Sequence, residues 1–238
     1  MSGHSKWASI RHKKGAADAK RGKAFSKLAK LISVAARDGS DPAMNFSLRL
    51  AVDRAKAVNM PKDNIERAIS RGAGDGEGAA LENAVYECMG PGGVSMLIVA
   101  LTDNTNRAYT NIKTTSNKNG GNMEAKVKWQ FDQRAVVRVE DISKIEDRDS
   151  IELELIDAGA MDIDWHEVDG LIVTSEVQDF KKTSNAVEAL ELAISAAGLE
   201  YVPNITVELT DDQGARLMKF IDLLEEDDDV DAVFTNAE

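Results

Sequence analysis

The chain has 238 residues, of which 43% are hydrophobic and 29% charged, as in a soluble globular protein. No run approaches the ~18 apolar residues of a membrane span, and the basic start lacks the apolar segment of a secretory signal. The single cysteine, Cys88, excludes an internal disulfide and a multi-cysteine zinc site. A reducing cytoplasm is therefore the expected compartment.

The net charge of −12 combines two blocks of opposite sign. Residues 1–72 contain 16 Lys and Arg against 6 Asp and Glu, a net of +10, and residues 73–238 contain 13 against 35, a net of −22. This asymmetry indicates a basic module that meets polyanions, carried on an acidic body. The alternative is a solvated surface, although ordinary surfaces intersperse both signs.

The positive charge is densest before residue 31. The candidate ligands for nucleic-acid phosphates are Lys6, Arg11, Lys13, Lys14, Lys20, Arg21, Lys23, Lys27 and Lys30. Cations of this kind release counterions when they neutralise phosphates, which dominates nucleic-acid affinity. Trp7 is a candidate for stacking on a base, and the alternative is that it docks on its own protein. Phosphate contacts position a protein without reading sequence, so DNA and structured RNA are not distinguished.

Residues 1–23 have no apolar period and are expected to form an arm, followed by a helical domain over residues 24–72. In its first helix, residues 24–37, apolar residues occupy one face and lysines the other. A second helix is expected to begin at Asp41-Pro42, and a third to run from Pro61 to Gly72. Three short helices predict either a plain bundle or one that resembles a helix-turn-helix.

The glycine-rich residues 73–80 follow a helix and lack the Gly-Lys-Ser/Thr ending of a phosphate loop, so we predict a linker. The next domain is expected to be discontinuous, with residues 81–132 completed by residues 210–238. Its predicted elements are strands 84–88 and 94–101 around the turn Gly90-Pro91-Gly92-Gly93, helix 106–117, strand 127–131, helix 211–226 and strand 231–234.

Residues 133–209 predict an inserted domain with the βαββαβ order of a ferredoxin-like fold. Its predicted elements are strand 135–140, helix 149–158, strands 161–168 and 171–176 joined at Asp169-Gly170, helix 184–197 ended by Gly198, and strand 201–209. The expected fold class is therefore α+β, with an N-terminal three-helix domain and two ferredoxin-like α/β domains, the third inserted into the second.

An enzyme is the remote alternative. Asp162, Asp164 and His166 would share one face of a strand, where they could bind a divalent metal, but a half-solvated strand alternates in the same way. No nucleophilic triad or phosphate loop is visible, so we expect no catalysis, cofactor or small-molecule substrate. The acidic run 225–231 is interpreted as a solvated loop, with a polyanion mimic that occupies the basic arm as the alternative.

Several motifs resemble the YebC/PmpR family, which includes the mitochondrial translational activator of cytochrome c oxidase. They are Ser2-Gly3-His4-Ser5-Lys6-Trp7, Ile10-Arg11-His12-Lys13-Lys14, Asp18-Ala19-Lys20-Arg21-Gly22-Lys23, Asn59-Met60-Pro61-Lys62-Asp63-Asn64-Ile65, Gly90-Pro91-Gly92-Gly93-Val94, Asp103-Asn104 with Asn106-Arg107, and Gly120-Gly121-Asn122. The resemblance spans essentially the whole chain. Cys88-Met89 and Met123–Lys126 depart from the family pattern.

The resemblance implies three domains and a cytoplasmic regulator associated with nucleic acid. Members are described as DNA-binding regulators of transcription, and others as ribosome-associated factors that assist translation. The expected partner is therefore DNA, or ribosomal RNA on the ribosome, with no membrane involved.

Overall fold

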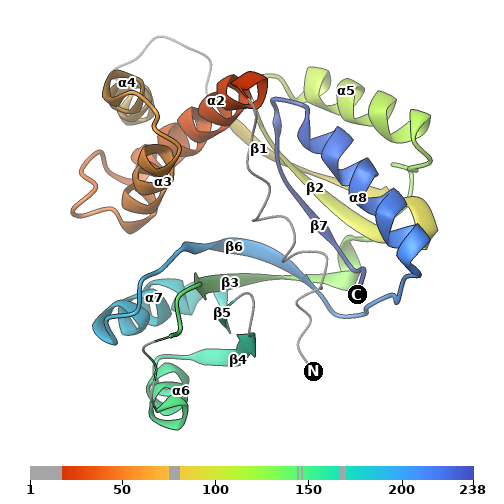
Figure 1. Ribbon diagram of the computed structural model, residues 1–238. Helices are drawn as coiled ribbons and strands as arrows, with labels where there is room; N and C mark the ends of the chain where they lie inside the picture. The colour runs from red at the N-terminus through yellow and green to blue at the C-terminus, as the bar shows by residue number, and fades with distance from the viewer. Residues whose placement is uncertain (1–17, 75–80, 144, 146, 167–169) are drawn as a thin grey trace. The chain divides into compact units, whose positions relative to one another are not determined.

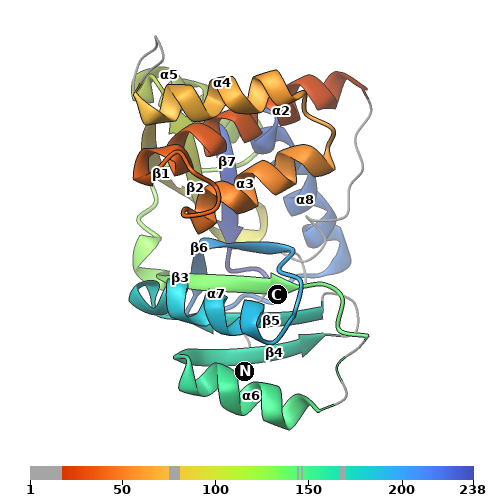
Figure 2. The ribbon, with the colours of Figure 1, turned by 90° about the vertical axis from the view of Figure 1, so that its left-hand side faces the viewer.

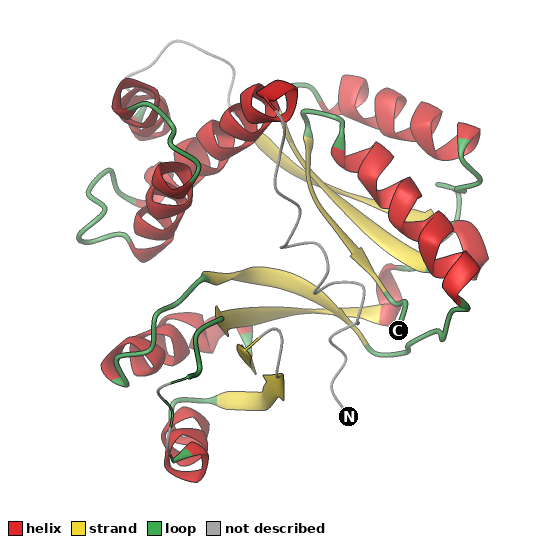
Figure 3. Ribbon diagram, viewed as in Figure 1, coloured by secondary structure: helices red, strands yellow, loops and turns green. Residues whose placement is uncertain are grey.

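The computed structural model describes residues 18–74, 81–143, 145, 147–166 and 170–238. These residues divide into two compact units, one formed by Phe131–Ile205 and the other by the remainder. The fold is α+β, as predicted, and the described strands form two antiparallel sheets (Figures 1 and 3).

Three helices pack together at the start of the second unit, as predicted. They are α2 (Asp18–Ala35), which a 3₁₀ turn extends over Ala36–Asp38, α3 (Phe46–Ala57) and α4 (Lys62–Ala73). Ile32 of α2, Leu48 of α3 and Ile65 of α4 meet in one buried core. The predicted period of α2 is therefore confirmed, because its apolar face is the one that packs.

The start of α3 and the end of α4 differ from the prediction. Asp41 begins a turn, accepting the N–H of Ala43, and the side chain of Asn45 caps α3 by accepting the N–H of Leu48. The side chain of Asp41 therefore stabilises a turn that precedes α3, and Asn45 is the N-cap of the helix. At the other end, Gly72 remains helical and Gly74 ends α4 in the left-handed region, with φ of 95°.

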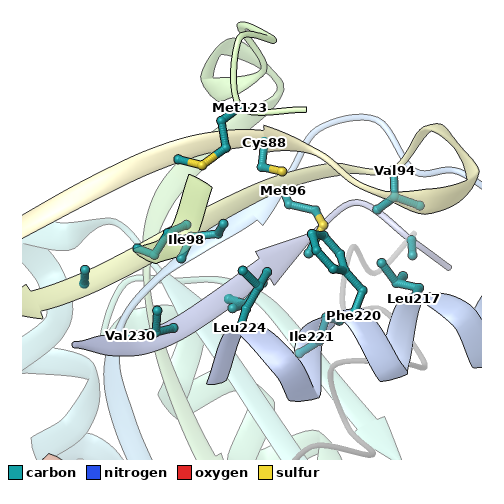
Figure 4. Close-up of a cluster of buried hydrophobic side chains, with 14 residues drawn as sticks. Cys88, Val94, Met96, Ile98, Met123, Leu217, Phe220, Ile221, Leu224 and Val230 are labelled. Atoms are coloured by element: carbon teal, nitrogen blue, oxygen red, sulfur yellow. The ribbon is translucent and has the colours of Figure 1, made fainter. Parts of the chain in front are cut away.

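The same unit contains a three-stranded sheet in the order β1-β2-β7. Its elements are β1 (Glu82–Met89), β2 (Ser95–Thr102), α5 (Thr105–Lys118), α8 (Asp211–Glu225) and β7 (Val230–Thr235). The last helix and strand return to this sheet, as predicted. Figure 4 shows Leu217, Phe220 and Leu224 of α8 facing the side chains of the strands, where they form a buried cluster.

The strand predicted over residues 127–131 is wrong. Lys128–Gln130 form a 3₁₀ turn, η4, and Phe131 already begins the first strand of the other sheet. The reason is local, because the carboxylate of Glu87 accepts the N–H groups of Val127 and Lys128 at 2.7 and 2.8 Å. These two N–H groups are therefore not available to pair with a neighbouring strand.

The other unit has the predicted βαββαβ order. Its elements are β3 (Phe131–Val139), α6 (Arg148–Asp157), β4 (Ala160–His166), β5 (Gly170–Ser175), α7 (Phe180–Ala189) and β6 (Ala196–Pro203). The sheet order is β4-β5-β3-β6, and Figure 2 shows α7 across β3 and β5. Asp169 of the predicted hairpin lies outside the described residues, and Gly170 has φ of 78°.

The helix predicted over residues 184–197 is displaced. α7 ends at Ala189, and Gly198 lies within β6, opposite Val136 of β3, instead of ending a helix. The hydroxyl and N–H of Ser195 both donate to the carbonyl of Arg138, which starts the pairing. Pairing with β3 therefore overrides the helix propensity of this alanine-rich segment.

Candidate nucleic-acid interface

The structure places three of the nine predicted cationic ligands. Lys6, Arg11, Lys13, Lys14 and the stacking candidate Trp7 lie outside the described residues. Lys20 and Arg21 fall in the first turns of α2, but their side chains are also outside the description. Lys23, Lys27 and Lys30 follow one another along α2, and their positions are described.

These three lysines contact the C-terminal end of α8. The ammonium of Lys23 donates to the carbonyl of Glu226 at 2.9 Å, and that of Lys27 to the carbonyl of Glu225 at 2.6 Å. Lys30 donates to the carbonyl of Asp228 at 2.9 Å. The last carbonyls of a helix lack partners and carry partial negative charge, so cations stabilise them. The lysines on this face of α2 therefore bind the segment at the end of α8 in the same protein.

Asp229 extends this contact into a buried ion network. Its side chain is 4% exposed, and its carboxylate lies 2.7 Å from the ammonium of Lys30 and 2.8 Å from the guanidinium of Arg107. Asn104 caps α5 by accepting the N–H of Arg107. The motif residues Asn104 and Arg107 thus act structurally, because they bring a cation from α5 to Asp229.

The acidic run 225–231 is therefore not simply the solvated loop that the sequence suggests. Glu226 and Asp228 are exposed, whereas Asp229 is buried and serves as a contact point for α2 and α5. The alternative interpretation, in which this run occupies the basic arm as a polyanion mimic, stays a prediction, because residues 1–17 and the side chains of residues 18–21 lie outside the described part of the chain. Lysines of the basic block bind its carbonyls and one of its carboxylates.

The network predicts a pH-dependent stability. Burial by itself raises the pKa of Asp229, but hydrogen bonds from Lys30 and Arg107 outweigh it and hold that pKa below its ordinary value. A depressed folded-state pKa contributes stability above the unfolded value of ~3.9 and loses it as pH falls through the folded value. Thermal unfolding of the wild type and Asp229→Asn should therefore differ most near neutral pH and converge below about pH 4. A constant difference would contradict this.

A groove of about 420 Å³ lies between α2 and α4. The two helices approach closely because the hydroxyl of Ser33 donates to the carbonyl of Ala68 at 2.8 Å and Gly72 has no side chain. Phe25 and Ala29 supply apolar lining. The groove therefore has an apolar part beside a polar one.

Cations line the polar part of this groove. Arg67 and Arg71, one turn apart on α4, are exposed there, and the half-buried Lys30 of α2, whose ammonium pairs with Asp229, also lines the groove. The guanidinium of Arg67 is oriented by donating to the carbonyl of Asp63 and to the side-chain oxygen of Asn64. Among the described residues no partner is found for the guanidinium of Arg71. Guanidinium groups present a planar fork that matches phosphate, so the groove is suited to bind a phosphodiester.

Arg67 and Arg71 belong to the basic block of residues 1–72, but they are not among the nine candidate ligands predicted from the sequence. The available signal is their spacing of four in a helix whose Ile65 and Ala68 are buried, because that spacing places both on one exposed face.

The residues of the alternative metal site do not meet in a metal-binding group. Asp162 is exposed on β4, and Asp164 and His166 are partly buried, while Ile163 and Trp165 pack against the core from the other face. In the described part of the chain, no group of three or more His, Cys, Asp or Glu side chains could hold a metal ion. Of the helices described there, none has the length and apolar character that crossing a membrane requires.

Two family models match the chain. Residues 5–75 match the TACO1/YebC protein N-terminal domain, and residues 81–237 match the TACO1/YebC second and third domain. The second match begins after the glycine-rich segment and covers both sheets.

Relatives and a solved structure agree with these matches over the full length. Proteins of Kosmotoga olearia and Enterococcus faecalis, each named "Probable transcriptional regulatory protein", are 45% and 44% identical. Those alignments cover 100% of this chain and 94% and 99% of the relatives. The crystal structure of a conserved hypothetical protein from Aquifex aeolicus is similar with a TM-score of 0.83 at 36% identity, covering 98% of this chain and 97% of that one.

Proposed function

The chain belongs to the TACO1/YebC family, and from this premise we propose that it is a nucleic-acid-binding regulatory protein that acts on transcription by binding DNA. The names of its relatives support a role in transcriptional regulation. The observation that carries the binding proposal is the cationic groove between α2 and α4, which lies within a segment of net charge +10 on an otherwise acidic chain.

The proposed interface combines two sets of cations. Arg67 and Arg71 each contact a phosphate in the groove, because their side chains lie one turn apart on the exposed face of α4. The arm contributes further phosphate ligands, namely Lys6, Arg11, Lys13, Lys14, Lys20 and Arg21. Lys23, Lys27 and Lys30 join them only if they release the end of α8, which they hold in this structure.

A pair of variants tests this interface. We expect Arg67→Gln combined with Arg71→Gln to weaken DNA binding and to lower the salt slope of log K by up to about 2, since two phosphate contacts are lost. We expect the arm variant Lys13→Glu, Lys14→Glu and Lys20→Glu to weaken binding about tenfold or more at physiological salt. Fluorescence anisotropy with a labelled duplex at several salt concentrations measures both effects.

The matched control reverses three exposed lysines elsewhere, Lys118, Lys181 and Lys219, so that the net charge changes by the same amount as in the arm variant. It should retain most of the affinity, because these lysines lie on α5, α7 and α8 outside the interface. If the control and the arm variant lose affinity equally, the effect is one of net charge and the assigned interface is wrong.

A ribosome-associated role would use the same cations on RNA, because phosphate contacts are common to both polymers. Crosslinking in cells, followed by sequencing of the bound nucleic acid, distinguishes the two. Enrichment of defined duplex DNA sites supports transcriptional control. Recovery of ribosomal RNA together with sedimentation on ribosomes would replace that conclusion with the translation role.

A further inference from the structure

Trp129 is the most exposed aromatic side chain among the described residues, with 69% of its surface accessible. It lies in η4, which follows α5 and directly precedes β3 in the chain. Its indole N–H donates to the carbonyl of Lys126 at 3.1 Å, which fixes one edge of the ring against the backbone. The accessible surface is therefore that of an oriented ring and not of a freely rotating side chain.

The backbone that carries Trp129 is held in place from β1. The carboxylate of Glu87 accepts the N–H groups of Val127 and Lys128, and Val127 is buried. Burial by itself would raise the pKa of Glu87, but these bonds and Lys126 lower it, so the carboxylate stays charged. Preorganisation of this kind reduces the ordering cost of binding.

The surroundings of the ring are charged. Lys126 and Lys128 are exposed on either side of the buried Val127, and the side chain of Lys126 is 81% accessible. Glu124 is also exposed. Protein-docking patches typically combine several exposed apolar side chains, whereas the exposed residues next to Trp129 in the chain are charged. Two cations beside an isolated ring fit a polymer that offers both a flat base and phosphates.

We propose that Trp129 stacks on an unpaired base of a bound nucleic acid, while Lys126 and Lys128 contact the neighbouring phosphates. This contact rests on the proposed function and adds a preference for single-stranded or melted segments. An indole ring stacks on any base, because every base has a π face, so the contact selects unpaired structure and not sequence.

The test compares a single-stranded oligonucleotide with an abasic strand of the same length. We expect Trp129→Ala to weaken binding of the base-containing strand by about 5- to 150-fold and to leave binding of the abasic strand unchanged. Trp129→Tyr should restore most of the affinity. Lys126→Gln with Lys128→Gln should weaken binding of both strands, because phosphates are present in each.

The matched control is Tyr109→Ala. Tyr109 is 38% exposed and has the ammonium of Lys113 5.5 Å from its ring centroid, so it is another accessible aromatic beside a lysine. Removing the Tyr109 ring should leave unchanged the preference of the protein for the base-containing oligonucleotide over the abasic one. In a variant with Trp7→Phe and Trp165→Phe, the remaining Trp129 fluorescence should be quenched by the base-containing strand alone.

The outcomes separate this inference from the proposed function. If the wild type binds no nucleic acid, the proposed function fails. If the wild type binds but Trp129→Ala and the wild type have equal affinities for the base-containing strand, nucleic-acid binding stands and the stacking contact is overturned. Circular dichroism of each variant establishes that its fold is retained.

Discussion

Replacing Asp229 with alanine is expected to lower the free energy of unfolding by about 2–3 kcal/mol. The substitution leaves the ammonium of Lys30, whose side chain is 20% exposed, without its carboxylate partner. It also removes one of the two carboxylates of Arg107, whose side chain is 49% exposed and which keeps Asp103. Removing one member of a buried ion pair costs more than the pair itself contributes, because the remaining charge is desolvated and uncompensated. Urea denaturation monitored by circular dichroism measures the change.

Asp228→Ala is the matched control, since Asp228 is the exposed neighbour of the buried Asp229 and contacts Lys30 through its backbone carbonyl. It should change stability by less than about 0.5 kcal/mol. Equal effects of the two substitutions would show that the buried network does not stabilise the contact between α2 and α8.

Gly72→Ala is expected to destabilise the helical domain by about 2–4 kcal/mol. A β-carbon at this position would lie 2.1 Å from the carbonyl oxygen of Ser33 and 2.7 Å from the β-carbon of Ala36. α4 must therefore move away from α2, which breaks the hydrogen bond from Ser33 to Ala68 and distorts the groove that contains Arg67 and Arg71. Thermal unfolding and the DNA-binding assay should both register the change.

The same substitution at Gly22 is the control for Gly72. A β-carbon at Gly22 meets no atom within 4 Å, and the residue lies inside α2. Because alanine favours helix over glycine, Gly22→Ala should leave stability unchanged or raise it by up to about 1 kcal/mol. Loss of stability in both variants would point to a general intolerance of substitution in this domain, and not to close packing of α2 on α4.

Elements whose signal lies within one short segment were predicted from the sequence. The apolar stripe of α2 and the order of strands and helices in the ferredoxin-like unit are examples, because each follows from local periodicity and turn residues. The two-residue turn predicted at Asp169-Gly170 is not found, because Gly170, with φ of 78°, begins β5 opposite His166.

Elements that depend on a distant partner were not predicted from the sequence. The helix predicted over residues 184–197 stops at Ala189, and the strand predicted over residues 201–209 is instead β6 (Ala196–Pro203), because β3 offers residues 196–203 a strand to pair with. η4 replaces the strand predicted over residues 127–131 because Glu87, on β1, takes two of its N–H groups. In both cases a tertiary contact outweighs local propensity.

The candidate interface also has features that the sequence predicts and features that depend on tertiary contacts. The sequence by itself determined that the first 72 residues are strongly basic and that lysines line one face of the first helix, because charge and helical period are local properties. Only the tertiary structure decided what those lysines contact. Lys23, Lys27 and Lys30 meet the end of α8 across some 200 residues of chain, and Arg67 and Arg71 line a groove that exists because Gly72 lets α4 approach α2. Such pairings depend on which distant surfaces the packed core brings together, which no local pattern encodes.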